Sequence, residues 1–183
     1  IEHILMEMND ESESDEFDDV DVWECIRNIM YPYEDMEVLN TRWEQILAEM
    51  TETFHENMDN EQYQETKEEF MTAMLEREYE YRNFITYLVF RYFAKAVYDY
   101  DVVGKAKMFV TNYFILRQMD MLVWYKKHKK FCFEDRIDTV HIFSRQVEYS
   151  EDNMEALYES FIFDDVFETD NLCKLLWIDS TAL

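Results

Sequence analysis

Apolar residues in this chain recur at intervals of three and four positions, the spacing of an amphipathic helix. The first series ends at the Tyr31-Pro32 step, because the residue before a proline disfavours helical geometry. Its members are Phe17, Val20, Trp23, Ile26 and Met30. A second series runs from Met36 to Phe54 and stops at the polar stretch 57–60. These patterns predict helices over 17–31 and 36–54.

A third helical segment begins near Glu61 and becomes dense in aromatic residues between 79 and 98. Such a surface, apolar on several sides, predicts that 82–98 is the buried central helix of the domain rather than a platform for stacking nucleobases. Asp101 is a predicted N-cap for a helix that runs to about Tyr125. Further helices are predicted over 134–148, 151–161 and 164–177, with Ser150 as the cap of the second of these.

The composition agrees with an all-helical protein. The 183 residues include only 1 Gly and 1 Pro, so the residues that form hairpin turns are scarce and a glycine-rich phosphate-binding loop is excluded. No heptad persists, so the fold class is all-α, an irregular multi-helix bundle of about seven helices. We assign 17–183 to a single helical domain and 1–16, at the start of a dense acidic run, to an acidic linker or N-terminal tail.

The net charge of −25 is unevenly distributed. Residues 1–80 hold 26 acidic and 4 basic side chains, residues 81–146 hold 6 acidic and 12 basic ones, and residues 147–183 hold 10 acidic and 1 basic one. We expect the acidic flanks to neutralise the basic middle inside one fold. Direct binding of nucleic acid is not expected at this charge, although an acidic protein can mimic a phosphate backbone.

Several other classes of protein fit the sequence poorly. The three cysteines, Cys25, Cys132 and Cys173, lie far apart without a Cys-x-x-Cys pair, which favours thiols in a reducing, cytoplasmic setting over disulfides or zinc. No apolar run reaches the roughly 18 residues of a membrane span, and no signal peptide is recognisable. Glu52-x-x-His55 and Asp138-x-x-His141 have the spacing of di-iron ligands, but in so acidic a chain we expect no metal site.

The stretch FSRQVEYSEDNMEALYESF, residues 143–161, places a cluster of polar residues at a helix joint. In one interpretation the cluster is structural: Arg145 and Glu148 pair one helical turn apart, while Ser150 caps the next helix and Asn153 completes that cap. In the other, polar residues of the joint and of the aromatic helix line a binding cleft. The candidate residues for such a cleft are Arg145, Glu148, Asn153, Asn83, Arg91 and Tyr92.

Three motifs give this chain a resemblance to the C-terminal helical region of the flagellin lysine-N-methylase family. They are N-[FY]-x-x-Y-x-x-[FY]-R-Y-F at Asn83 to Phe93, the break Val97-Tyr98-Asp99-x-Asp101, and F-S-R-x-x-E-x-S-x-x-N at Phe143 to Asn153. The resemblance covers about 80 residues well, the preceding 60 loosely and the first 20 not at all. The family often has His where this chain has Tyr149 and Gly where it has Tyr100, so no role of that histidine carries over.

The resemblance implies a longer enzyme that methylates lysines of flagellin. Its N-terminal half is cysteine-rich and is thought to hold an iron-sulfur cluster, and its methyl donor is expected to be S-adenosylmethionine. This chain lacks the cysteine cluster, so we expect no cofactor in it, no catalytic residue and no activity on its own. The implied role is recognition of flagellin or completion of the active-site cleft. The alternative is a stand-alone acidic interaction module or nucleic-acid mimic, and the oligomeric state stays open.

Overall fold

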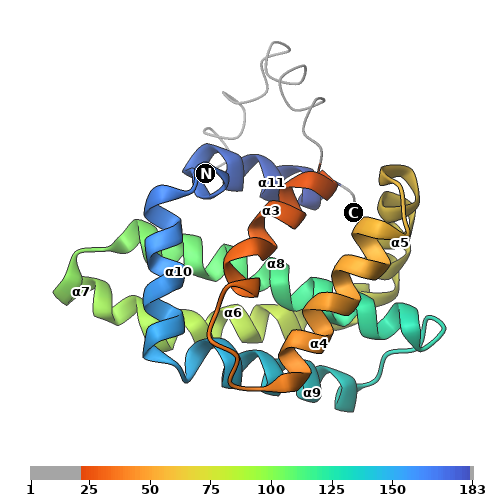
Figure 1. Cartoon of the computed structure of the whole chain (residues 1–183), viewed down its shortest axis with the longest axis horizontal. Helices are drawn as coiled ribbons and strands as arrows, with labels where there is room; N and C mark the ends of the chain where they lie inside the picture. Colours follow the sequence, from red (N-terminus) through yellow and green to blue (C-terminus); the bar gives the residue numbers. More distant parts are fainter. Residues whose placement is uncertain (1–21, 182–183) are drawn as a thin grey trace, which may run out of the picture.

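A computed structural model describes residues 22–181 of the chain, with side chains described as far as residue 176. Every element within these residues is helical and no β-strand occurs among them (Figure 1), which confirms the predicted all-α class. None of the helices in this part of the chain is long and apolar enough to span a membrane. The predicted tail, 1–16, and the first two apolar positions of the first predicted helix lie outside the described residues.

When consecutive helical elements are joined, the described residues form seven helical runs and one separate three-residue 3-10 turn, η5, in agreement with the predicted number of helices. The first two are α3 (Val22–Glu34) and α4 (Thr41–Met50) with the π-helical η1 (Thr51–Glu56). The third contains α5 (Asn60–Met74), η2 (Leu75–Arg77), α6 (Glu78–Tyr92), η3 (Phe93–Lys95) and α7 (Ala96–Asp99). The others are α8 (Val102–Lys126), α9 (Phe133–Phe143) with the π-helical η4 (Ser144–Glu148), α10 (Glu151–Phe163), and α11 (Thr169–Thr181) after η5 (Asp165–Phe167).

The central helix is α8, and the prediction that 82–98 has this place is wrong. The 25-residue α8 crosses the middle of the bundle (Figure 1) and contacts α3, α4, α5, α6, α9, α10 and α11. By contrast, α6 buries one stripe, which consists of Tyr81, Phe84, Leu88 and Tyr92. Phe90 is 82% exposed and Tyr98 is 85% exposed. The aromatic density of α6 therefore reflects a buried face together with an exposed aromatic face.

Several predicted helix boundaries differ from the structure, and the last predicted helix, 164–177, begins at Thr169 and ends at Thr181. Helix α3 continues through Pro32 to Glu34, because a proline so close to a helix end removes only one hydrogen bond of the last turns. The second predicted helix begins at Thr41 rather than at residue 36. Asn40 is its N-cap and accepts a hydrogen bond of 2.9 Å from the backbone N–H of Arg42. The apolar residues before this cap continue the spacing of three and four positions, but they do not belong to the helix.

The predicted caps at Asp101 and Ser150 are both confirmed. Asp101 accepts a hydrogen bond of 2.8 Å from the backbone N–H of Gly104, and Ser150 accepts one of 3.1 Å from that of Asn153. The cap of α8 depends on the glycine, because a Cβ at position 104 would lie 2.1 Å from Oδ2 of Asp101. Before this cap, Tyr100 turns the chain in the left-handed conformation, with φ of 60°.

Acidic side chains of α4 and α5 pair with the lysines at the C-terminal end of α8. Lys126 lies 2.9 Å from Glu49 of α4, and Lys129 lies 2.5 Å from Glu69 of α5. These pairs support the expectation that the acidic flank neutralises the basic middle within the fold.

Candidate functional site

The candidate site lies where the C-terminal half of α6 meets η4. A π-helical turn carries the hydrogen bond of 3.2 Å from Tyr149 N–H to the Ser144 carbonyl, five residues earlier. Ser144 and Glu148 lie on one face of this turn, and Arg145 is exposed. Glu148 therefore points into the bundle, toward α6.

The Glu148 carboxylate is saturated with hydroxyl donors. Its Oε2 accepts hydrogen bonds of 3.0 Å from the hydroxyls of Tyr87 and Tyr92, and its Oε1 accepts one of 2.7 Å from Ser144. The side chain is 1% exposed. A buried carboxylate needs such partners because leaving it unpaired would cost several kcal/mol, on the order of 3–5.

Arg91 covers this carboxylate from the solvent side. Its Nε lies 3.7 Å from Oε2 of Glu148, and its Nη1 donates a hydrogen bond of 2.8 Å to the Tyr87 hydroxyl. The guanidinium carbon also lies 5.8, 5.4 and 5.6 Å from the ring centres of Tyr87, Tyr92 and Tyr149. We call these five residues, Tyr87, Arg91, Tyr92, Glu148 and Tyr149, the Glu148 cluster.

The electrostatics of the Glu148 cluster suit the binding of a cation. Burial, followed by the charge of Glu148, raises the pKa of the Tyr92 hydroxyl, and burial with the hydrogen bond to Glu148 also raises that of Tyr87. Both tyrosines therefore stay neutral donors at physiological pH. Because its side chain is buried beneath Arg91, the Glu148 carboxylate is placed to hold a positive charge.

Asn153, another predicted site residue, has a different place in the structure. Its side-chain amide donates hydrogen bonds of 2.8 Å to the Gln146 carbonyl and 3.0 Å to the Glu37 carbonyl. Gln146 in turn accepts a hydrogen bond of 3.0 Å from the Leu39 N–H. These contacts tie the connection before α4 to the joint between η4 and α10, so Asn153 stabilises the fold there.

The structure brings together only part of the predicted set. Glu148, Arg91 and Tyr92 meet, whereas Asn83 and Arg145 are exposed and lie outside the cluster. The predicted Arg145–Glu148 pair is wrong, because the π turn separates residues that an α-helix would align. The ion pair of Glu148 is with Arg91 instead.

Three residues around Glu148 were not predicted as site residues: Tyr87, Ser144 and Tyr149. A signal was present for two of them. Tyr87 stands four residues before Arg91, and Ser144 stands four before Glu148, a spacing that puts side chains on one helix face. Tyr149 follows the π turn, and no spacing rule indicated its position.

A second buried polar cluster, also missed from the sequence, joins α6, α8 and α9. Arg136 lies 2.7 Å from Asp120 and 3.3 Å from Glu80, and its guanidinium stacks 3.8 Å from the ring centre of Tyr81. Asp120 accepts hydrogen bonds of 2.9 Å from Tyr81 and 2.6 Å from Thr139. The charged groups of this cluster pair with one another, so the cluster stabilises the packing of α6, α8 and α9.

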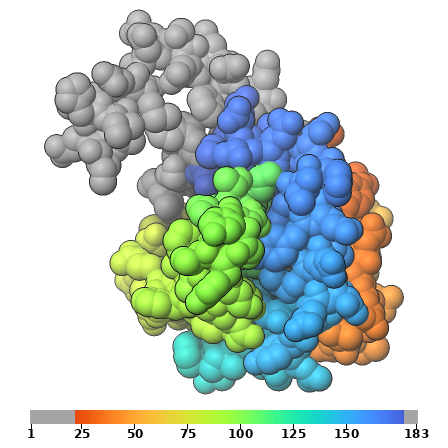
Figure 2. Space-filling model, turned by 90° about the vertical axis from the view of Figure 1, so that its left-hand side faces the viewer, coloured from red at the N-terminus to blue at the C-terminus, as the bar shows by residue number. Residues whose placement is uncertain are grey.

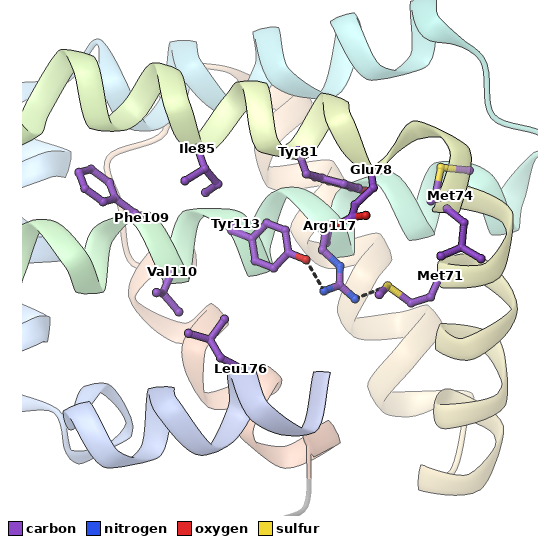
Figure 3. A pocket seen from close by; sticks show the side chains of 11 residues that line it. Met71, Met74, Glu78, Tyr81, Ile85, Phe109, Val110, Tyr113, Arg117 and Leu176 are labelled. Atoms are coloured by element: carbon purple, nitrogen blue, oxygen red, sulfur yellow. Dashed lines mark hydrogen bonds between the residues drawn. The ribbon is translucent and has the colours of Figure 1, made fainter. Parts of the chain in front are cut away.

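A largely apolar cleft of about 360 Å³ opens between α5, α6, α8 and α11 (Figure 3). Arg117 points into it between Tyr113, which accepts a hydrogen bond of 2.8 Å from its guanidinium, and the sulfur of Met71. The other lining residues are Met74, Leu75, Glu78, Tyr81, Ile85, Phe109, Val110 and Leu176. None of the predicted site residues lines this cleft, so it is separate from the Glu148 cluster.

The described residues do not fit an iron-sulfur cluster or another metal site. No group of three His, Cys, Asp or Glu side chains in this part of the chain is arranged to hold a metal ion. Cys132 precedes α9 and Cys173 lies on α11, both exposed. His55, from the Glu52-x-x-His55 spacing, is buried, whereas His141, from the other, is exposed. No step of a mechanism is therefore assigned to a cluster in this chain.

Comparison with known proteins gives one match. No curated protein and no solved structure matches the chain. A family described as the FliB lysine N-methylase C-terminal domain matches residues 1–175. This match includes the first 20 residues, in which the sequence motifs had indicated no resemblance. Because it covers nearly the whole chain, the protein belongs to the FliB lysine N-methylase C-terminal domain family.

Proposed function

We propose that this domain serves lysine N-methylation of flagellin by recognising flagellin, and that the surface around the Glu148 cluster makes the contact. The observation that carries the proposal is the convergence of two separate motifs on one carboxylate. Tyr87, Arg91 and Tyr92 come from α6, and Glu148 comes from η4, more than 50 residues later. Family membership supplies the link to flagellin.

The surroundings of the cluster support a role in binding another protein. Tyr149 is 70% exposed, and Phe90, next to Arg91, is also largely exposed. Exposed aromatic side chains beside a cation are enriched at protein interfaces, because they bury a large area at low entropic cost. Figure 2 looks onto this end of the molecule, where the α6–α7 region and α10 form one surface.

In this role the domain recognises flagellin and carries out no chemical step. The Glu148 carboxylate is enclosed by hydroxyl donors, so it is unsuited to removing a proton from a substrate amine. We therefore expect no methyl transfer when the 183-residue chain is incubated with purified flagellin and S-adenosylmethionine. Methyllysine detected by mass spectrometry in that mixture would contradict this part of the proposal.

A crosslinking pull-down of unmodified flagellin by this chain tests recognition. We expect capture by the unaltered chain and reduced capture by Tyr149→Ala. Phe133→Ala is the matched control, because Phe133 is also an exposed aromatic residue but starts α9, beyond the far end of α8. Absence of capture by the unaltered chain would favour the other implied role, completion of an active-site cleft. Equal loss in both variants would argue against the Glu148 cluster as the contact.

A further inference from the structure

Arg91 occupies a place that has the chemistry of a cation-binding site. Three tyrosine rings surround its guanidinium at 5.4–5.8 Å, and a buried carboxylate lies beneath it. Aromatic faces with a carboxylate are how proteins recognise ammonium groups, including methylated ones, because the ring quadrupole and the negative charge both attract a cation. The position is filled here by a side chain of the protein itself.

Arg91 is held less firmly than Glu148 and Tyr92, which are both buried. Its side chain is 39% exposed, its Nε is 3.7 Å from the carboxylate, and it donates one close hydrogen bond, to Tyr87. Glu148 keeps its three hydroxyl donors if Arg91 moves outward. The carboxylate then stays hydrogen-bonded but loses its cationic partner, so an incoming cation can replace the guanidinium.

We propose that Tyr87, Tyr92 and Tyr149 over Glu148 form a binding site for an alkylammonium side chain, and that Arg91 fills this site when no ligand is bound. The ligand class is lysine or N-methylated lysine on an extended segment, whose four-carbon stem reaches a buried carboxylate while its backbone stays outside. A second cation, Lys95, lies 5.4 Å from the ring centre of Tyr92, so this ring already faces two positive charges. The assignment rests on the proposed function only in identifying the lysine as one of flagellin.

Removing Arg91 should open the site to a small probe. We expect Arg91→Ala to bind Nα-acetyl-lysine N-methylamide and its Nζ-trimethyl form saturably, measured by chemical shifts of the tyrosines in NMR titrations. The uncharged norleucine analogue, with the same stem length, should not bind. The unaltered protein should bind the lysine probe more weakly than Arg91→Ala, since Arg91 competes for the same rings.

Two further variants test the binding site that Tyr87, Tyr92 and Tyr149 form over Glu148, which we call the cage. Tyr149→Ala in the Arg91→Ala background should weaken lysine binding by about three- to fivefold, the loss of one exposed cation–π contact. Glu148→Gln in the same background keeps the shape but removes the charge, and it should weaken binding more. If Arg91→Ala loses its helical circular dichroism, Arg91→Met, which retains the stem length, replaces it. Absence of saturable binding to Arg91→Ala, or equal binding of lysine and norleucine probes, would overturn the proposal.

Probe binding to Arg91→Ala and capture of flagellin can succeed or fail independently of each other. Flagellin captured by the unaltered chain, without probe binding to Arg91→Ala, would leave the proposed function standing and refute the cage. Probe binding to Arg91→Ala without capture of flagellin would support the cage and refute flagellin as its source of lysine.

Discussion

Tyr92 donates a hydrogen bond of 3.0 Å to the carboxylate of Glu148, 56 residues further along the chain. Both groups are buried, so this bond fixes the end of α6 against the π turn that follows α9. The joint and the Glu148 cluster are therefore one structure, because the tyrosines that support the carboxylate also form the walls around Arg91.

Removing this hydroxyl should measurably destabilise the domain. We expect Tyr92→Phe to lower the free energy of unfolding by about 1–2 kcal/mol, because the carboxylate loses one of its three donors. Tyr98→Phe is the control and should change it by less than about 0.5 kcal/mol, since Tyr98 is 85% exposed. Urea unfolding followed by circular dichroism measures both, and similar values for the two variants would contradict the assignment.

The buried Arg136 should be among the most sensitive positions. Arg136→Leu leaves Asp120 and Glu80 without their shared cation, and we expect a loss of about 3–5 kcal/mol. Arg82→Leu, on the exposed face of α6, should cost less than about 0.5 kcal/mol. The double variant Asp120→Leu/Arg136→Leu should regain part of the lost stability. If it is no more stable than Arg136→Leu, the two residues are not coupled.

His55 should make the domain less stable in mild acid. Burial, followed by the charge of Arg27, lowers the pKa of this imidazole from 6.5 to about 4, and neither ring nitrogen has a hydrogen-bond partner among the described residues. The unfolded chain binds this proton more readily than the folded one. The contribution is therefore complete above pH 6.5 and is lost as the pH falls from 6.5 toward 4.

The variant His55→Leu isolates this contribution. Between pH 7.5 and pH 5 the unaltered protein should lose about 1–2 kcal/mol more stability than His55→Leu does. His141→Leu, at an exposed position on α9, should lose as much as the unaltered protein. Parallel losses in the unaltered protein and His55→Leu would mean that His55 is protonated in the folded state.

The cap of α8 should make the replacement of Gly104 by alanine destabilising. A Cβ at this position would lie 2.1 Å from the Asp101 carboxylate, so the cap must open, and we expect Gly104→Ala to cost about 1–2 kcal/mol. Asp101→Ala removes the same hydrogen bond. If the cap is the cause, the double variant should cost little more than Asp101→Ala alone, whereas additive losses would place the clash elsewhere.

Part of the candidate site could be predicted from the sequence. The motifs at 83–93 and 143–153 and the polar cluster at the helix joint indicated Glu148, Arg91 and Tyr92. The pairing of Arg145 with Glu148 was expected because regular helical spacing was assumed through residue 148, and Asn83 was included as a polar residue of the aromatic helix. The π turn changes which residues share a face, and no pattern in a single sequence announces such a turn.

The helical class, the caps at Asp101 and Ser150 and the family were predictable from the sequence, because these depend on composition, local hydrogen bonds and short motifs. Contacts between distant segments make α8 rather than α6 the central helix, and they pair Glu148 with Arg91 rather than with Arg145. Periodicity identifies an apolar face but not its partner. Which of two apolar helices is enclosed depends on contacts between segments far apart in the chain.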